Sequence, residues 1–182
     1  MKTEKKIRSK IPKIPKSGAI LPLYHACEEN AVSLLDEAEI LFDQKRYARA
    51  FFLAFTALEE IGKSQLVADY LTDCISENEF RDAFKRHDLK VAYLYRYVLV
   101  SDKIGQENAK IEYNMEDSKD EIQLRMNSLY VSLTDNHEVS KPKDKVDRKT
   151  AMKMIEEVKE HLHLILNAEW LNQRLGSKGL FK

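Results

Sequence analysis

YARAFFLAFTALEEIGKSQLVADYLTD, residues 47–73, is the stretch of this sequence that decides the fold. Apolar residues recur along it at steps of three and four, which is the spacing of one helix face. In its first half the intervening positions are apolar as well, including Phe52, Leu53 and Ala57. A helix that is apolar nearly all round is buried among other elements. We therefore expect residues 47–73 to form the central, most buried helix of the protein.

Further helices can be placed on both sides of this one. The first should run from about Leu23 to Asp43, and Ser76 with Glu79 forms a capping-box pattern that opens a third. The third carries one apolar stripe, made by Phe80, Phe84, His87, Val91, Leu94 and Val98. A shorter helix is expected near 119–133, and a long last one over about 148–175. The prolines fall outside these segments and strand-like alternation is lacking, so the predicted fold class is all-α, a bundle of four to five helices.

The charge of the chain is unevenly distributed. The 182 residues include 30 basic and 30 acidic side chains, yet residues 1–16 hold seven Lys or Arg against one acid, so they carry +6 and the remainder carries −6. Pro12 and Pro15 oppose a helix there. We expect a basic flexible tail over residues 1–20 and a single helical domain over residues 21–182. The tail either steers the protein toward RNA or only aids solubility, and both interpretations stay open.

Several classes of protein are disfavoured by what the chain lacks. Cys27 and Cys74 form no CxxC pair, which is typical of a reduced, intracellular protein. The longest nearly unbroken apolar run, residues 50–58, is too short for a membrane span, which needs about 20 residues. The sequence has no Walker loop, GxSxG or HExxH, and too few carboxylate-x-x-His repeats for a di-iron site. We therefore expect a cytoplasmic protein without a metal or other cofactor.

Polar residues interrupt the apolar surface of the central helix at 58–63, LEEIGK. Glu59 lies on a largely buried flank, where a carboxylate must find a partner, and Lys63 is one turn away and can pair with it. Gly62 costs about 1 kcal/mol relative to Ala in mid-helix, which indicates a close approach of another helix. Glu59, Glu60 and Lys63 belong either to a polar functional site or to an ordinary structural ion pair.

The third helix carries His87 on its apolar stripe, where a histidine is either a satisfied core residue or a catalyst. Arg81 precedes it by six residues and Lys90 follows one turn later. Such a His can move protons to or from a ribose 2′-hydroxyl or leaving oxygen, while an Arg stabilises the charge on the phosphate. On a straight helix Arg81 and His87 would point about 120° apart. Their convergence requires a distorted helix or an Arg from a second subunit.

A second basic–aromatic pair, Arg125 and Tyr130, lies in the expected shorter helix. Either Arg125 supplies charge to a phosphate site, or Tyr130 packs on the bundle with the Arg at its rim. The candidate catalytic residues are thus His87, Arg81 and Arg125. The candidates for binding a substrate or orienting the site are Glu59, Glu60, Lys63, Lys90 and Tyr130.

Three segments, in this order, resemble the signature of the AbiV-type abortive-infection proteins, a family of the HEPN superfamily of small helical bundles. The first segment contains Tyr47-Ala48-Arg49-Ala50 and Ala57-Leu58-Glu59-Glu60-Ile61-Gly62-Lys63. The second is His87-Asp88-Leu89-Lys90, and the third joins Arg125 to Leu129-Tyr130-Val131. The resemblance covers roughly residues 23–166 and leaves the basic tail outside.

The resemblance implies a HEPN-like bundle and a phage-defence protein that halts the growth of infected cells, as a homodimer. Many HEPN proteins are metal-independent ribonucleases with an Arg, four to six residues and a His, and Arg81 and His87 match that spacing. The resemblance thus implies an RNA-directed toxin. Two alternatives stay open. One is a non-catalytic effector with a degenerate nuclease motif, which binds a phage-encoded trigger protein or the translation machinery, and the other is a helical adaptor.

Overall fold

The computed structural model describes residues 18–71, 75–91, 115–170, 174–176 and 179–181. The predicted basic tail lies almost wholly outside these residues. The long helices are α1 (Ile20–Asp43), α2 (Tyr47–Leu71), α5 (Met115–Leu129) and α7 (Arg148–Trp170), and the short ones are α3 (Glu77–Lys85) and α6 (Pro142–Lys145). Two small antiparallel hairpins pair β1 (Ser132–Leu133) with β2 (Val139–Ser140), and β3 (Arg174–Gly176) with β4 (Gly179–Phe181). The all-α fold class is confirmed.

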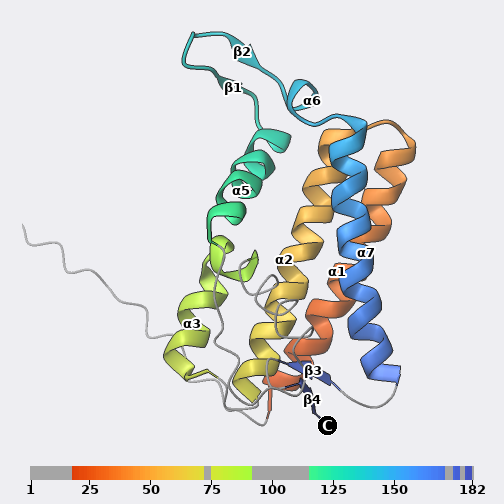
Figure 1. Cartoon of the computed structure of the whole chain (residues 1–182), viewed down its shortest axis with the longest axis vertical. Helices are drawn as coiled ribbons and strands as arrows, with labels where there is room; N and C mark the ends of the chain where they lie inside the picture. Colours follow the sequence, from red (N-terminus) through yellow and green to blue (C-terminus); the bar gives the residue numbers. More distant parts are fainter. Residues whose placement is uncertain (1–17, 72–74, 92–114, 171–173, 177–178, 182) are drawn as a thin grey trace, which may run out of the picture.

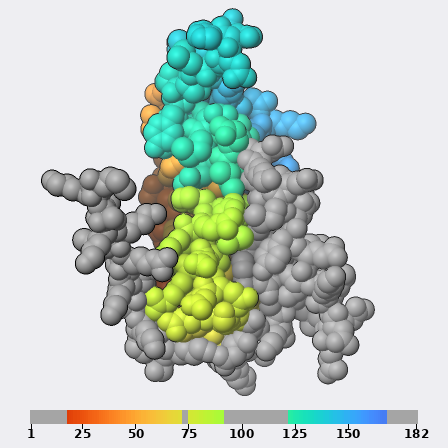
Figure 2. Space-filling view, turned by 90° about the vertical axis from the view of Figure 1, so that its left-hand side faces the viewer, coloured from red at the N-terminus to blue at the C-terminus, as the bar shows by residue number. Residues whose placement is uncertain are grey.

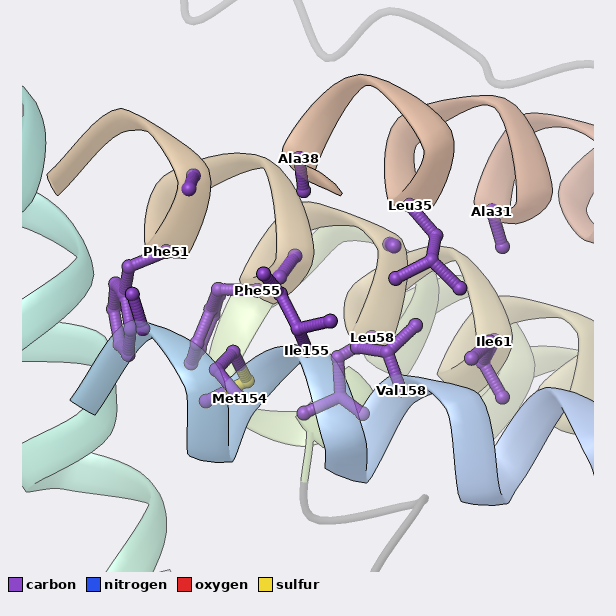
Figure 3. Close-up of a cluster of buried hydrophobic side chains, with 14 of the residues drawn as sticks. Ala31, Leu35, Ala38, Phe51, Phe55, Leu58, Ile61, Met154, Ile155 and Val158 are labelled. Carbon is purple, nitrogen blue, oxygen red and sulfur yellow. The ribbon is translucent and has the colours of Figure 1, made fainter. Parts of the chain in front are cut away.

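Helix α2 is the centre of the bundle, as its sequence predicts. It packs against both α1 and α7, which also contact each other, while α5 and α3 follow one another along its remaining side (Figure 1). Phe51, Phe55, Leu58 and Ile61 are at most 2% exposed. Figure 3 shows these side chains of α2 packed against apolar residues of α1 and α7. Those of α1 are Ala31, Leu35 and Ala38, and those of α7 include Met154, Ile155 and Val158. The nearly continuous apolar surface of α2 is therefore covered by neighbours on several sides.

Several predicted boundaries shift. Helix α1 starts at Ile20, so Pro22 lies in its first turn, where the missing N–H has no intrahelical partner to lose. Pro142 is the first residue of α6. Leu175, expected as the end of the last helix, belongs to β3. The hairpins were not predicted, because strands of two or three residues leave no alternating pattern. In the part of the chain that the structure describes, no helix combines the length and apolarity of a membrane span.

The predicted third helix is broken at Arg86. The capping box is confirmed: the Ser76 hydroxyl accepts the Glu79 amide proton, and the Glu79 carboxylate accepts that of Ser76. Helix α3 ends at Lys85, Arg86 is extended with φ −103° and ψ 124°, and a second helical segment starts at His87. Its described part covers residues 87–91 and is called segment 87–91 below.

An ion pair accompanies this break. The side chain of Arg86 pairs with Asp88 in the first turn of segment 87–91, where an acidic residue is favoured by the helix dipole. The guanidinium hydrogen bond lowers the pKa of Asp88 below its ordinary value. The apolar stripe continues across the break, so periodicity alone predicts one uninterrupted helix.

The turn between α1 and α2 places a lysine in the left-handed region. Lys45 has φ 59°. Its N–H donates to the carbonyl of Phe42, and the N–H of Arg46 donates to the carbonyl of Leu41. This is the Schellman arrangement, in which the left-handed position is usually glycine. A lysine there costs about 1 kcal/mol of conformational strain.

Helix α7 buries a histidine, His161, which is only 8% exposed. Loss of hydration on burial lowers its pKa from the ordinary 6.5 to about 4. As the pH falls from 6.5 toward 4, the unfolded chain binds a proton there that the folded chain does not. Stability contributed by neutral His161 is therefore complete above pH 6.5 and lost as the pH falls to about 4.

We expect the free energy of unfolding to fall by about 3 kcal/mol between pH 7 and pH 4 because of His161 alone. Denaturant titrations at both pH values measure this difference. In His161→Leu the pH-dependent loss should shrink by that amount, whereas His163→Leu, which replaces an exposed histidine of the same helix, should behave as the wild type. An identical pH dependence in both variants would contradict the assignment.

Candidate functional site

The candidate site is built around the carboxylate of Glu59 on α2. Glu59 is 3% exposed. Its Oε1 lies 2.9 Å from Nδ1 of His87, which donates to it, and its Oε2 lies 3.5 Å from Nη2 of Arg125. One buried carboxylate thus holds a histidine from segment 87–91 and an arginine from α5. We call Glu59, His87 and Arg125 the Glu59 triad.

Arg125 is fixed by aromatic rings as well as by Glu59. Its guanidinium carbon lies 5.1 Å from the ring centre of Phe52 and 5.8 Å from that of Phe55, both on α2. These distances allow cation–π attraction, which strengthens when the cation is partly desolvated. The side chain is 14% exposed, and its Nε is buried without a hydrogen-bond partner among the described residues. Arg125 therefore has donor capacity that Glu59 does not use.

A second ion pair on α2 involves Glu60, the residue that follows Glu59. Lys63 pairs with Glu60, three residues before it, and its ammonium lies 5.9 Å from the ring centre of Phe84 on α3. The expected pairing of Lys63 with Glu59 is therefore wrong. The reason is that Glu59 already has two partners on other helices, whereas Glu60 faces Lys63 directly.

Cys27 on α1 adjoins this second pair. Burial, followed by the nearby carboxylate of Glu60, raises the pKa of Cys27 from 9.0 to about 12. Glu28, 4% exposed, adds a smaller effect of the same sign. In the sequence Cys27 is noted only in relation to disulfides and metal sites, and Glu28 is not among the candidate residues. Their place on the buried stripe of α1, with Tyr24 and Ala31, is the signal that identifies them.

Lys90 brings a further buried cation to the site. It is 6% exposed, and burial, followed by repulsion from Lys63, lowers the pKa of its ammonium. The charges of Glu59 and Glu60 act in the opposite direction. The predicted polar residues of α2 and segment 87–91 therefore interact electrostatically and form one group with the Glu59 triad.

Gly62 explains how segment 87–91 reaches the site. A Cβ added to Gly62 would lie 2.2 Å from the carbonyl oxygen of Lys90 and 2.9 Å from its carbonyl carbon, both backbone atoms. Only a glycine leaves room for this contact. The close approach expected from the sequence is thus confirmed, and it sets the distance between α2 and the segment that carries His87.

We predict that Gly62→Ala destabilises the protein by about 1–3 kcal/mol, although alanine is the better helix former. The clash is with backbone, so relief requires segment 87–91 to move away from α2. Thermal or denaturant unfolding measures the effect. Gly18→Ala is the matched control, because an added Cβ at Gly18 meets nothing within 4 Å. Equal stability of the two variants would show that the close approach does not exist.

The remaining candidates lie elsewhere or are more exposed than expected. Arg81 binds Glu77 on its own helix, with Nη2 2.6 Å from Oε1, rather than joining the Glu59 triad. Tyr130, just beyond α5, is 57% exposed. The side chain of His87 is 53% exposed, so its predicted core position is wrong. The break at Arg86 is the reason, because it places His87 at the first turn of a new helix.

The Glu59 triad has the arrangement of a general base with its orienting group. A carboxylate that accepts Nδ1–H of a histidine fixes the tautomer and leaves the lone pair on Nε2. The partly exposed ring can then take a proton from a substrate or return one. Arg125, anchored beside it, supplies positive charge for an anionic group. The arrangement suits acid–base chemistry at a phosphate.

Comparison with known proteins assigns the family. A search of the curated proteins and a search of the solved structures found no match to the chain. A scan against protein-family models matched residues 19–163 to HEPN_AbiV, described as AbiV. The match covers α1, α2, α3, α5 and most of α7, and includes every residue of the Glu59 triad. The chain belongs to the HEPN_AbiV family of abortive-infection proteins.

Proposed function

We propose that the protein acts in phage defence as an RNA-directed toxin of the HEPN kind, a metal-independent endoribonuclease that halts growth or translation in infected cells. The observation that carries the proposal is the Glu59 triad, in which one buried carboxylate binds His87 and Arg125. Family membership supports the role in abortive infection. The proposal places this activity in the cytoplasm.

In the proposed reaction His87 transfers a proton. The ribose 2′-oxygen forms a bond to the adjacent phosphorus as the bond from phosphorus to the 5′-oxygen breaks. Nε2 of His87 takes the proton of the 2′-hydroxyl, and the departing 5′-oxygen takes a proton from water. The hydroxide that remains is neutralised by the proton on His87, which restores the free base. The products are a 2′,3′-cyclic phosphate and a 5′-hydroxyl. No step of this reaction requires a metal ion.

Arg125 is the arginine that the geometry favours for the phosphate. It shares Glu59 with His87 and is held above Phe52 and Phe55, so its charge is positioned before a substrate arrives. Arg81 carries the family's sequence spacing but is bound to Glu77. Glu59 orients His87. Lys63 and Lys90 add positive charge near Glu59. We also propose a homodimer, as the family resemblance implies.

We predict that His87→Ala lowers the rate of RNA cleavage by about 10²–10⁴-fold, because proton transfer is lost. Excess chelator should leave wild-type cleavage unchanged, and a substrate with 2′-deoxyribose should not be cleaved. Arg125→Lys should cost about 10²-fold, since a point charge replaces a guanidinium fork. Labelled RNA resolved by electrophoresis gives both the rates and the cyclic-phosphate ends.

Two variants serve as controls for these rates. His163→Ala removes an exposed histidine of α7 and should cleave as the wild type. Arg81→Ala distinguishes the two arginines, since it should retain activity if Arg125 serves the phosphate. Wild-type protein that cleaves no RNA, or cleavage that survives in His87→Ala, would refute the nuclease.

One surface favours the second candidate function, a non-catalytic effector that binds a phage protein. The β1–β2 hairpin projects beyond the end of the bundle (Figure 1). The hairpin exposes apolar side chains: Leu133 and Val139 on its strands, and Val131 just before it, are 61–69% exposed. Figure 2 shows this hairpin and α5 above α3 on one face of the molecule. Exposed apolar side chains gathered on a projecting element are typical of a protein-binding surface.

We expect tagged protein from infected cells to retain a phage-encoded protein if this second function holds. Replacing Leu133 and Val139 by Ser should abolish the retention, because the apolar contact is lost. The matched control replaces Ile40 and Leu166, two exposed apolar residues of other helices, by Ser and should retain the partner. Mass spectrometry of the captured proteins measures the outcome, and the absence of phage protein from the wild-type sample would refute the effector.

A further inference from the structure

Lys90 places a buried charge beside the Glu59 triad. It is 6% exposed, although lysine is among the residue types that are least often fully buried. The close ion pairs of Glu59 and Glu60 are made by other side chains. Lys90 therefore acts on these two carboxylates through space, as a charge that the fold keeps in a fixed place.

The backbone determines where this charge lies. The carbonyl of Lys90 rests on Gly62 of α2, where an added Cβ would come within 2.2 Å of its oxygen. The N–H of Lys90 donates to the carbonyl of Arg86, which ties Lys90 to the start of segment 87–91. His87 precedes Lys90 by three residues, the spacing of neighbours on one helix face. The imidazole and the ammonium therefore belong to the same side of the segment, beside α2.

Charged groups of α2 and α5 act on Lys90. Burial, followed by repulsion from Lys63, lowers the pKa of Lys90, whereas the carboxylates favour its ammonium form. Two carboxylates face three cations here, so the group carries one net positive charge when His87 is neutral. The members of this group are Glu59, Glu60, Lys63, Lys90 and Arg125.

The other charges of the adjoining elements have partners of their own. On segment 87–91, Asp88 is bound to Arg86. On α1, Glu28 lies 3.7 Å from Nδ1 of His25, and it also acts on Cys27. On α3, the side chain of Arg81 is bound to Glu77. These charges stay the same when Lys90 is replaced, so they do not alter a comparison between variants at that position.

Glu59 by itself favours the form of His87 that cannot act as a base. A carboxylate 2.9 Å from Nδ1 attracts a second proton to the ring, because an opposite charge stabilises imidazolium. An imidazolium has no lone pair on Nε2 and cannot accept a proton. Cations around Glu59 oppose this effect, because they compensate the carboxylate without a proton on His87.

Lys90 is the cation of the group that has this compensation as its remaining role. Arg125 is the arginine that faces a phosphate in the proposed reaction, and Lys63 is bound to Glu60. Without Lys90 the group is neutral, and a proton on His87 merely restores the charge that the wild type already has. We infer that Lys90 is a positioning residue: its buried charge, acting through Glu59, keeps the imidazole of His87 neutral and able to accept a proton.

This inference rests on the proposed function only in so far as the neutral ring serves as the base in RNA cleavage. The effect of the charge on His87 is measured without RNA. Diethyl pyrocarbonate acylates neutral imidazole and leaves imidazolium unmodified. The full chain is treated with this reagent across the titration range of histidine, and mass spectrometry of its peptides gives the rate of acylation at His87.

Lys90→Met removes the charge and keeps a side chain of similar length. It should move the midpoint of the acylation curve of His87 toward higher pH by about one unit, because imidazolium is no longer repelled. Lys90→Gln should move it in the same direction, which separates the effect of charge from that of packing. Both variants should fold, since the loss of Lys90 also relieves its repulsion from Lys63.

Two variants and one residue serve as controls. Lys90→Arg keeps the charge and should give the wild-type curve. Lys153→Met removes an exposed lysine of α7 and should do the same. The exposed His137, between β1 and β2, should give one curve in every variant. A midpoint at His87 that stays in place in both neutral variants, or that Lys90→Arg moves equally, would overturn the inference.

RNA cleavage is scored separately. If the wild type cleaves RNA, the acidic limb of its pH–rate profile should move in Lys90→Met as the acylation curve does, which lowers the rate on that limb about tenfold. A shifted acylation curve in a protein that cleaves no RNA supports the role of Lys90 and refutes the nuclease. Cleavage with unshifted curves supports the nuclease and overturns the role of Lys90.

Discussion

The carboxylate of Glu59 sits on the most buried helix of the bundle, where an unpaired charge would cost more free energy than the fold can supply. His87 and Arg125 meet this requirement from two other elements. The same contacts that make the buried charge tolerable therefore bring a proton-transfer group and a cation together. Removing either partner leaves the buried carboxylate with one partner instead of two, so stability and chemistry are coupled at this residue.

The distance across which Glu59 meets His87 is set by backbone rather than by side chains. Gly62 lies against the carbonyl of Lys90, and the chain leaves the helical conformation at Arg86 just before that contact. Separate packing surfaces explain the break. Phe80 of α3 stacks on Tyr70, with ring centres 4.8 Å apart, whereas segment 87–91 rests on the glycine. A single straight helix would have to satisfy both surfaces at one angle.

The sequence predicts the all-α fold, the central place of α2, the capping box at Ser76 and the close approach at Gly62, because each depends on local pattern. The break at Arg86 is not predictable in this way, since the apolar stripe continues through it. The partners of Glu59 are not predictable from local pattern either. Proximity in the helix suggests Lys63, whereas the actual partners, His87 and Arg125, are 28 and 66 residues away. The pocket lined by the turn from α1 into α2, the end of α5 and α6 draws on three distant segments and leaves no signal in any one of them.

The burial of Cys27 beside Glu60 has a practical consequence. Alkylating reagents attack the thiolate, and a pKa of about 12 keeps the sulfur of Cys27 protonated at neutral pH. In the closed structure this cysteine is therefore nearly inert. In a variant in which Cys74 is replaced, the rate at which a reagent alkylates Cys27 measures how often α1 separates from α2 next to the Glu59 triad. The labelling rate then reports how often the bundle opens locally beside Glu60.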